Sequence, residues 1–187
     1  MKKPLIFASL ILAAGPSFAA NEFEDGLREL ATSQLQAWVQ DPLVVQAIRA
    51  QNVETAGLPQ SEIDRLDTQW RGETVDGALI SSVLGNELSH HFRNLKEDSG
   101  GLFAEIFATD AKGLNVGQSD PTSDYWQGDE AKWQGPFLTG EIEIGDVEFD
   151  ESSQAYQSQV SIPIIDPATG ARIGALTVGV DVGVLSQ

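Results

Sequence analysis

The spacing of apolar residues changes about half-way along the chain, and this change constrains the fold more than any other feature. Before residue 100, apolar residues recur every three or four positions, which is the spacing of one face of an amphipathic helix. From Phe103 onward they alternate with polar or small residues, as they do in strands that bury one face. Helices followed by an antiparallel sheet are typical of α+β domains. We therefore expect a long N-terminal helix and further helices packed on an antiparallel sheet of about five strands.

The first helices have clear boundaries in the sequence. Residues 23–39 carry apolar side chains at helical spacing over about five turns. Asp41 followed by Pro42 predicts the start of a second helix, because the carboxylate can accept from a free backbone amide and proline is tolerated at the first helical position. The Gly-Leu-Pro sequence at 57–59 should end this helix.

Two more helices are expected before the sheet begins. Ser61 and Asp64 have the spacing of a capping box, with aspartate in the position that glutamate or glutamine usually takes. They predict the start of a short helix that extends to Trp70. The apolar spacing over 75–96 predicts one further helix, which the Ser-Gly-Gly sequence at 99–101 should end.

Alternation in the second half predicts the strands. Strands are expected over 103–109, 114–116, 141–144, 147–149, 156–164 and 175–182. The alternation changes phase at Gly145, which indicates a bulge or a tight turn. Residues 118–135 read as a polar and aromatic loop. One face of the last strand carries only small or short side chains, and this leaves room for either a packed helix or a ligand.

The N-terminus has the pattern of an export signal. Lys2 and Lys3 precede an apolar run over 5–14, and Ser17-Phe18-Ala19 places small residues where a signal peptidase reads them. The run is shorter than the roughly 20 residues that span a bilayer. We expect residues 1–19 to be removed. Residues 20–100 then form the helical part, and 101–187 the sheet part, of one periplasmic domain.

Composition excludes several classes of function. The formal net charge of -17 gives a surface that repels phosphate backbones, so we expect no nucleic-acid partner. The chain has no cysteine, which excludes disulfides, thiol catalysis and cysteine-ligated metals. An exported protein without disulfides fits a bacterial envelope.

No catalytic or cofactor-binding motif is present. The sequence lacks a G-x-S-x-G elbow, a P-loop, a dinucleotide fingerprint and a calcium-binding loop. His90 and His91 are the only histidines, and neighbours on a helix point in different directions, so they predict no metal site. The sequence predicts no enzyme, no cofactor and no metal. A carboxylate-based hydrolase stays open, because it needs only two acidic residues at the right separation.

Several segments together resemble a known family. Residues 105–120 and 122–133 look like the strand-turn-strand and following loop of Cache domains, the extracellular PAS-like (PDC-type) sensor domains. Residues 149–153 fit the same pattern. Residues 163–166 and 173–181 resemble the last two strands of these domains, and 41–52 resemble their helical start. The resemblance covers most of the chain after residue 19. Its most specific part is the segment 124–133.

The resemblance implies a fold and a function. Cache domains pack a long N-terminal helix on a PAS-like sheet, and they usually bind small molecules outside the membrane in chemoreceptors and sensor kinases. No transmembrane helix and no signalling domain follow Gln187. We therefore expect a free-standing periplasmic sensor module. Its partners would be a small-molecule ligand and a membrane-bound chemoreceptor or sensor kinase.

The same resemblance suggests where a ligand binds. Aromatic rings next to carboxylates suit a small polar or cationic metabolite, and the loop after residue 120 carries both. An aspartate near the last strands completes the pocket in related sensors. The predicted ligand-binding residues are Asp124, Tyr125, Trp126, Asp129, Trp133 and Asp181. As alternatives, the tryptophans anchor the loop to the core, and Asp181 is a surface or turn carboxylate.

A second hypothesis belongs to a different class of function. The helix over 23–39 could pair with its equivalent in a homodimer or dock on a membrane sensor. The protein would then be an interaction module without a functional pocket.

Overall fold

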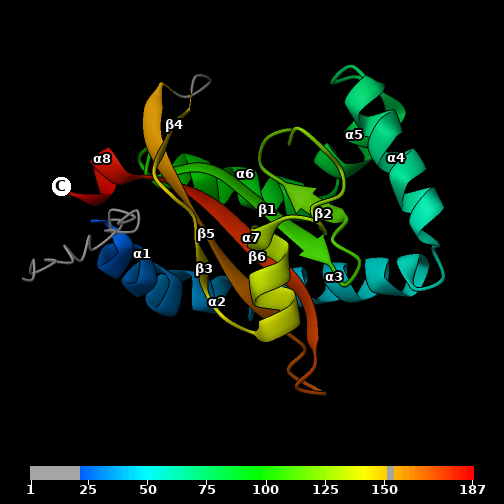
Figure 1. The fold of residues 1–187 in the computed structure, drawn as a ribbon, viewed down its shortest axis with the longest axis horizontal. Helices are drawn as coiled ribbons and strands as arrows, with labels where there is room; N and C mark the ends of the chain where they lie inside the picture. Colours follow the sequence, from blue (N-terminus) through cyan, green and yellow to red (C-terminus); the bar gives the residue numbers. More distant parts are fainter. Residues whose placement is uncertain (1–21, 151–153) are drawn as a thin grey trace, which may run out of the picture.

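The computed structural model describes residues 22–150 and 154–187 (Figure 1). The predicted signal peptide, residues 1–19, lies outside the described residues, and so do Glu151, Ser152 and Ser153 of the segment that resembles Cache domains. Within the described part, no helix is long and apolar enough to cross a membrane.

A six-stranded antiparallel sheet forms the centre of the fold. Its strands are β1 (Phe103–Asp110), β2 (Asn115–Gln118), β3 (Glu143–Ile144), β4 (Glu148–Asp150), β5 (Ala155–Ile165) and β6 (Arg172–Asp181). They run in the order β2-β1-β6-β5-β3, and β4 also pairs with β5. The α+β prediction is confirmed, with one strand more than the expected five. The phase change at Gly145 separates β3 from β4.

Helices cover one face of this sheet and bury the main core against it (Figure 1). They are α1 (Glu24–Leu30), the π-helical turn η1 (Ala31–Leu35), α2 (Gln36–Trp38), α3 (Pro42–Thr55) and α6 (Glu87–Asp98). Leu27, Leu35, Ile48 and Phe92 from these helices are fully buried. The apolar side of the helix predicted over 23–39 thus packs inside its own chain, and its remaining positions are mostly polar and exposed.

The predicted boundaries of α3 hold, and the predicted start of the next helix shifts. Asp41 caps α3 as predicted, since its carboxylate accepts from the backbone N–H of Leu43 at 2.8 Å. The predicted capping box is wrong. The N-cap residue of helix α4 (Gln60–Gly72) is Pro59, two positions before Ser61, and no side chain caps the helix. Asp64 instead accepts from the side chain of Gln60 at 2.8 Å.

The helix predicted over 75–96 is two helices. α5 (Ala78–Leu84) ends at Gly85, and Asn86 starts α6 by accepting from the backbone N–H of Ser89 at 2.8 Å. The Asn86 amide also donates to the carbonyl of Val116 at 2.7 Å, which ties the break to β2. Helices α4 and α5 lie beside the sheet and form a smaller core around Trp70 and Tyr125 (Figure 1).

The opposite face of the sheet is only partly covered. The short helix α7 (Ala131–Trp133) continues into the π-helical turn η2 (Gln134–Thr139), and both contact β5 and β6 (Figure 1). The sequence predicted a loop here as far as residue 135. A proline and a glycine within η2 mask the helical pattern. The small side chains of β6 therefore receive a packed helix along part of their length, and a cavity opens beside the rest.

The turn between β5 and β6 is fastened to α3 by Asp166. Its carboxylate accepts from Arg49 Nε at 2.8 Å and from the backbone N–H of Ala168 at 2.7 Å. The hydrogen bond from Arg49, supported by the turn amides, lowers the pKa of Asp166 from its ordinary 3.8 to about 2.

This pKa predicts a loss of stability in acid. A carboxyl whose pKa is lowered by folding stabilises the folded state above pH 4, and this contribution disappears as the pH falls from about 4 to about 2. We expect Asp166→Asn to lower the Tm at pH 6 and to flatten the dependence of Tm on pH between 4 and 2. Thermal unfolding across that range measures both. Parallel Tm curves for the two proteins would contradict this role of the pair.

Candidate functional site

A polar cavity opens on the less covered face of the sheet. We call it the sheet cavity; its volume is about 490 Å³. It lies between β1, β5, the end of β4, helix α6 and the loop that leads to α7. Its lining residues are Lys96, Ala104, Glu105, Phe107, Asp120, Pro121, Thr122, Ser123, Gln127, Lys132, Asp150, Gln157 and Gln159. A second hollow of about 350 Å³ adjoins it along β4.

Strand register brings the cavity floor together. Glu105 and Gln159 both pair with Gly179 of the central strand β6, one from each side. Gly179 leaves the space between them open, because a Cβ there would lie 2.8 Å from both Glu105 Cγ and Gln157 Oε1. The face of β6 that carries only small or short side chains therefore forms part of the floor of the sheet cavity.

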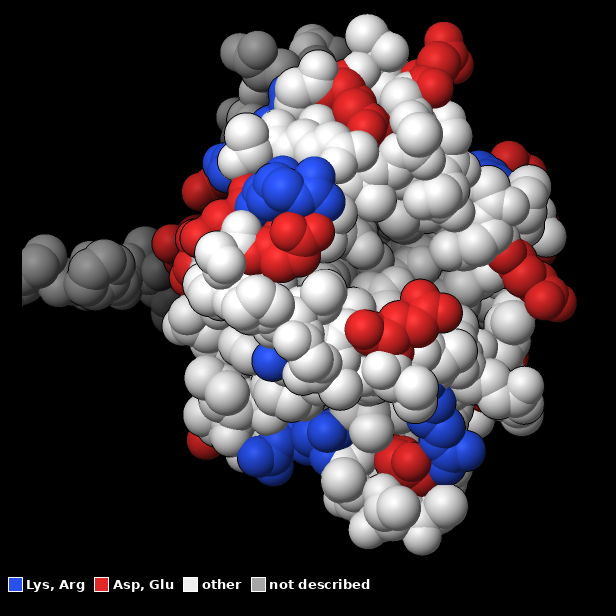
Figure 2. Space-filling model, turned by 90° about the vertical axis from the view of Figure 1, so that its right-hand side faces the viewer, with Lys and Arg blue, Asp and Glu red and all other residues white. Residues whose placement is uncertain are grey.

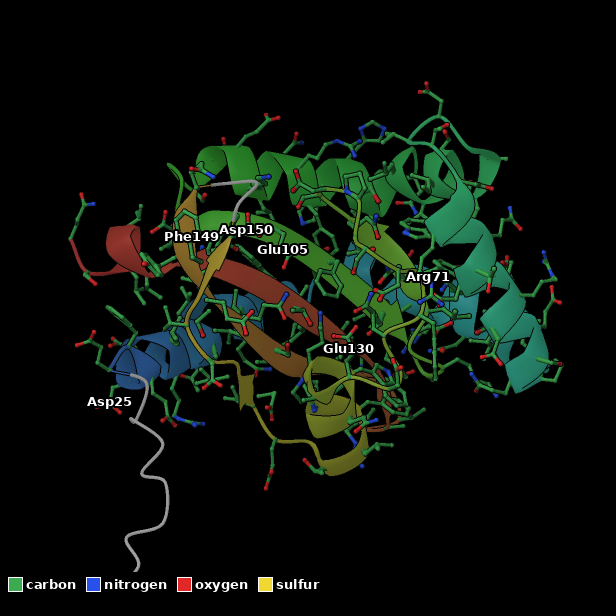
Figure 3. All side chains as sticks on the ribbon, turned by 45° about the horizontal axis from the view of Figure 1, so that its top comes forward. Asp25, Arg71, Glu105, Glu130, Phe149 and Asp150 are labelled. Carbon is green, nitrogen blue, oxygen red and sulfur yellow. The ribbon has the colours of Figure 1, made fainter. Side chains whose placement is uncertain are left out.

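Glu105 is the central carboxylate of the cavity. Its Oε1 accepts from Gln159 Nε2 at 2.7 Å. Burial raises the pKa of Glu105 above its ordinary value, and the carboxylates of Asp120 and Asp150 act in the same direction. The Gln159 hydrogen bond and the charge of Lys132 oppose the rise. Figure 3 shows Glu105 and Asp150 over the same part of the sheet, with Glu130 at the start of α7.

Both lysines of the cavity are paired with carboxylates. Lys96 Nζ lies 2.7 Å from each carboxylate oxygen of Asp120. Lys132 Nζ lies 3.0 Å from Glu130 Oε2 and 5.6 Å from the centre of the Phe107 ring. The cavity thus has a cation held above an aromatic ring at its α7 side.

The loop that carries most of the predicted site residues frames the cavity but turns these residues away from it. The Asp124 carboxylate accepts from Gln127 Nε2 at 2.7 Å, and its carbonyl accepts from Asn115 Nδ2 at 3.1 Å. Tyr125 is buried and stacks on Trp70 with ring centres 5.4 Å apart. Burial raises the pKa of Tyr125 to about 12, with smaller contributions from Asp110 and Glu54.

The tryptophans of this loop fasten it to the strand turn. Trp126 Nε1 donates to the carbonyl of Lys112 at 2.8 Å. Trp133 Nε1 donates to the carbonyl of Asp110 at 3.0 Å, and its ring stacks on Phe137. These contacts match the alternative in which the tryptophans anchor the loop. Asp129 is exposed on the same loop.

Asp181 lies apart from the other predicted residues. Its carboxylate caps α8 (Val182–Leu185) by accepting from the backbone N–H groups of Gly183 and Val184 at 2.8 and 3.1 Å. Trp133 contacts the Asp110 end of β1, which pairs with Gly174, seven residues before Asp181 on β6. At the ordinary rise of a strand, the two ends are about 23 Å apart. The structure therefore does not bring all six predicted residues together, and none lines the hollows described above.

The sequence contains only a weak indication of the residues that line the cavity, and the sequence analysis did not predict them. Gln157 and Gln159 alternate with β-forming residues, and Glu105 interrupts an otherwise apolar strand. Polar residues on one strand face more often meet solvent, so this pattern alone does not indicate a site. Within residues 22–150 and 154–187, no three histidine, aspartate or glutamate side chains gather as a metal site would require.

Solved structures of sensor domains resemble this fold at low sequence identity. The E. coli DcuS sensor domain matches with 16% identity and a TM-score of 0.39 over 68% of this chain and 91% of that chain. The V. cholerae histidine kinase DctB sensor domain matches with 16% identity and a TM-score of 0.39 over 88% of this chain and 59% of that chain.

A chemoreceptor domain is similar to the same degree. The sensory domain of the Campylobacter jejuni chemoreceptor Tlp3 with isoleucine bound matches with 16% identity and a TM-score of 0.40, over 89% of this chain and 66% of that chain. The chain thus spans less than two thirds of the DctB and Tlp3 domains. These matches are sensor domains rather than enzymes. No family model matches the sequence, and no curated protein is similar enough to match it.

Proposed function

We propose that this protein is an exported Cache-type sensor module that reversibly binds a small polar molecule in the sheet cavity and carries out no covalent chemistry. The cavity itself carries the proposal. Its volume of about 490 Å³ lies within the roughly 300–1,000 Å³ that is common for ligand pockets. Polar groups from β1, β5, α6 and the 120–132 loop converge on it.

Binding would work by enclosure. The loop over 120–132 forms one wall of the cavity, and Asp67 fastens its middle by accepting from the backbone N–H of Tyr125 at 2.9 Å. The β4 wall is a three-residue strand at the sheet edge. Closure of this wall over a ligand would change the surface offered to a membrane-bound chemoreceptor or sensor kinase. A ligand shifts such an equilibrium only by its different affinity for the two states.

A ligand screen with a blocked cavity tests this proposal. Thermal unfolding would be measured against amino acids, amines, organic acids, purines and pyrimidines. A ligand at 100 times its Kd adds about 2.7 kcal/mol of stability. Ser123 is exposed at the cavity rim. We expect Ser123→Trp to weaken binding of any hit at least tenfold, because the indole would occupy the opening.

Ser82→Trp is the matched control. Ser82 is exposed on α5, and it makes one local hydroxyl hydrogen bond, as Ser123 does. The Ser82→Trp variant should bind any ligand found in the screen with the same affinity as the unmodified protein. A folded protein that responds to no compound, or a hit that binds both tryptophan variants equally, would contradict a ligand site in the sheet cavity.

The residues predicted from the sequence can be tested in the same assay. If Asp181 contacts ligand, Asp181→Ala weakens binding. If it only caps α8, the variant loses some stability and keeps its Kd. We propose the second outcome, because the Asp181 carboxylate already accepts two backbone hydrogen bonds.

A further inference from the structure

The chemistry of the cavity restricts the class of ligand, provided that the proposed binding function is correct. The first observation concerns charge. Each lysine of the sheet cavity already has a carboxylate partner, Asp120 for Lys96 and Glu130 for Lys132. Glu105 makes no ion pair within residues 22–150 and 154–187, and its recorded hydrogen-bond partner is the neutral amide of Gln159. The positive charges of the cavity are therefore neutralised, and a buried negative charge is left over.

The second observation is independent of charge and concerns Gln127. This side chain lines the cavity and is only 1% exposed. Its Nε2 donates to both the carbonyl and the carboxylate of Asp124, at 3.1 and 2.7 Å. Both amide hydrogens are thus used, and this fixes the orientation of the amide. Among the described residues, Oε1 has no hydrogen-bond partner. This oxygen also has almost no accessible surface of its own, so the Gln127 amide is a fixed part of the cavity wall.

The third observation concerns Phe107, which lines the cavity two residues after Glu105 on β1. Phe107 is buried, and Lys132 Nζ lies 5.6 Å from the centre of its ring. The surroundings of the ring thus already accommodate one ammonium group. Aromatic faces attract cations more strongly where water is excluded.

We infer that the sheet cavity binds a small organic cation, an ammonium or guanidinium compound whose N–H groups donate to Glu105 near the Phe107 ring. A carboxylate ligand would meet the leftover charge of Glu105 and would have to displace Asp120 or Glu130 from a lysine. A neutral ligand would leave Glu105 without a counter-charge. A cation supplies Glu105 with a counter-charge, and hydrogen bonds between charged partners are the stronger ones.

Matched compounds test the inference. The pairs would be putrescine with 1,4-butanediol, agmatine with succinate, and α-amino acids with their N-acetyl derivatives, each titrated by calorimetry. We expect the compounds that bind to carry a cationic nitrogen, and affinity to fall at least tenfold when that nitrogen is acetylated or replaced by a hydroxyl group.

One variant connects the compounds to Glu105. Glu105→Gln keeps the shape of the side chain and removes its charge, so we expect at least a tenfold loss of cation affinity without a lower Tm. Glu97→Gln is the matched control. It removes one negative charge next to Lys96 on the exposed side of α6 and should leave the affinity unchanged.

The possible results separate this inference from the proposed function. An anion or an uncharged compound that binds the unmodified protein and is blocked by Ser123→Trp would overturn the cation inference and keep the ligand-binding function. Cation binding that Glu105→Gln does not weaken would also overturn it. Failure of every class of compound would remove the ligand-binding function itself.

Discussion

Gly174→Ala is expected to lower the free energy of unfolding by about 3 kcal/mol, because a side chain at this position would overlap the neighbouring strand. Gly174 lies in the central strand β6, where it pairs with Asp110 on one side and Ile164 on the other. A Cβ built on it would lie 2.0 Å from the carbonyl oxygen of Thr109 and 3.2 Å from Ile48 Cγ2. The first of these atoms belongs to the backbone, so no side-chain rotation can relieve the overlap.

Relief of this overlap requires β1 to move away from β6. Such a movement lengthens the ladder hydrogen bonds of the central pair and disturbs the packing of α3 on the sheet. Urea unfolding followed by circular dichroism measures the loss as a lower midpoint at an unchanged slope.

Gly72→Ala is the control for this prediction. Gly72 is the last residue of α4, and a Cβ there would meet nothing within 4 Å. Alanine is favoured over glycine in helices by up to about 1 kcal/mol. The stability of this variant should be equal or slightly higher. If the two variants unfold at the same urea concentration, the close approach at Gly174 does not limit the fold.

Features of the fold that depend on neighbouring residues in the chain could be predicted from the sequence. The Asp41-Pro42 start of α3, the Ser-Gly-Gly sequence after α6 and the turn before β6 are each specified by residues within one turn. Gly100, Gly101 and Gly170 all have positive φ angles, which a glycine adopts without strain. Alternation likewise predicted the strands, because β1, β5 and β6 each turn an apolar face to the helices.

The break between α5 and α6 depended on contacts distant in sequence. Leu84 and Leu88 keep the spacing of one continuous helical face across the break, so periodicity alone joined the two helices. The hydrogen bond from the side chain of Asn86 to the carbonyl of Val116 comes from a strand that begins 29 residues later. No pattern within the helices shows this contact.

The cavity also depends on contacts between residues that are distant in sequence. Glu105 and Gln159 are 54 residues apart and meet because both pair with Gly179. The strand of each residue could be predicted from the sequence, but the order β1-β6-β5 decides which polar side chains become neighbours. The sequence also singled out the loop that forms one wall of the cavity. Its aromatic residues turned out to hold the loop in place, while Gln127 and Lys132 between them reach the cavity.

Asp110→Ala is expected to lower the free energy of unfolding by about 3 kcal/mol, because this fully buried carboxylate organises the turn between β1 and β2. Its Oδ1 accepts from the backbone N–H groups of Lys112 and Leu114 at 2.8 and 2.9 Å. Its Oδ2 accepts from Thr55 Oγ1 at 2.8 Å and from Gln51 Nε2 at 3.2 Å, which ties the turn to α3.

The loss comes mainly from the backbone donors. Thr55 and Gln51 have other acceptors in reach, the carbonyls of Gln51 and Leu114 respectively. The buried N–H of Leu114 would have no such replacement, and a buried donor without a partner costs about 1–3 kcal/mol. Asp110→Asn keeps one oxygen for the turn amides but points an amide at Gln51 Nε2. We expect an intermediate loss of about 1 kcal/mol for that variant.

Asp110→Ala should also affect ligand binding. The carbonyl of Asp110 accepts from Trp133 Nε1, and Trp133 follows Lys132 on α7. A loosened turn lets α7 move away from the cavity, so ligand affinity should fall along with stability. Asp129→Ala, which removes an exposed carboxylate from the same loop, should change stability by no more than about 0.5 kcal/mol. Equal urea midpoints for Asp110→Ala and Asp129→Ala would show that the turn holds its shape without this carboxylate.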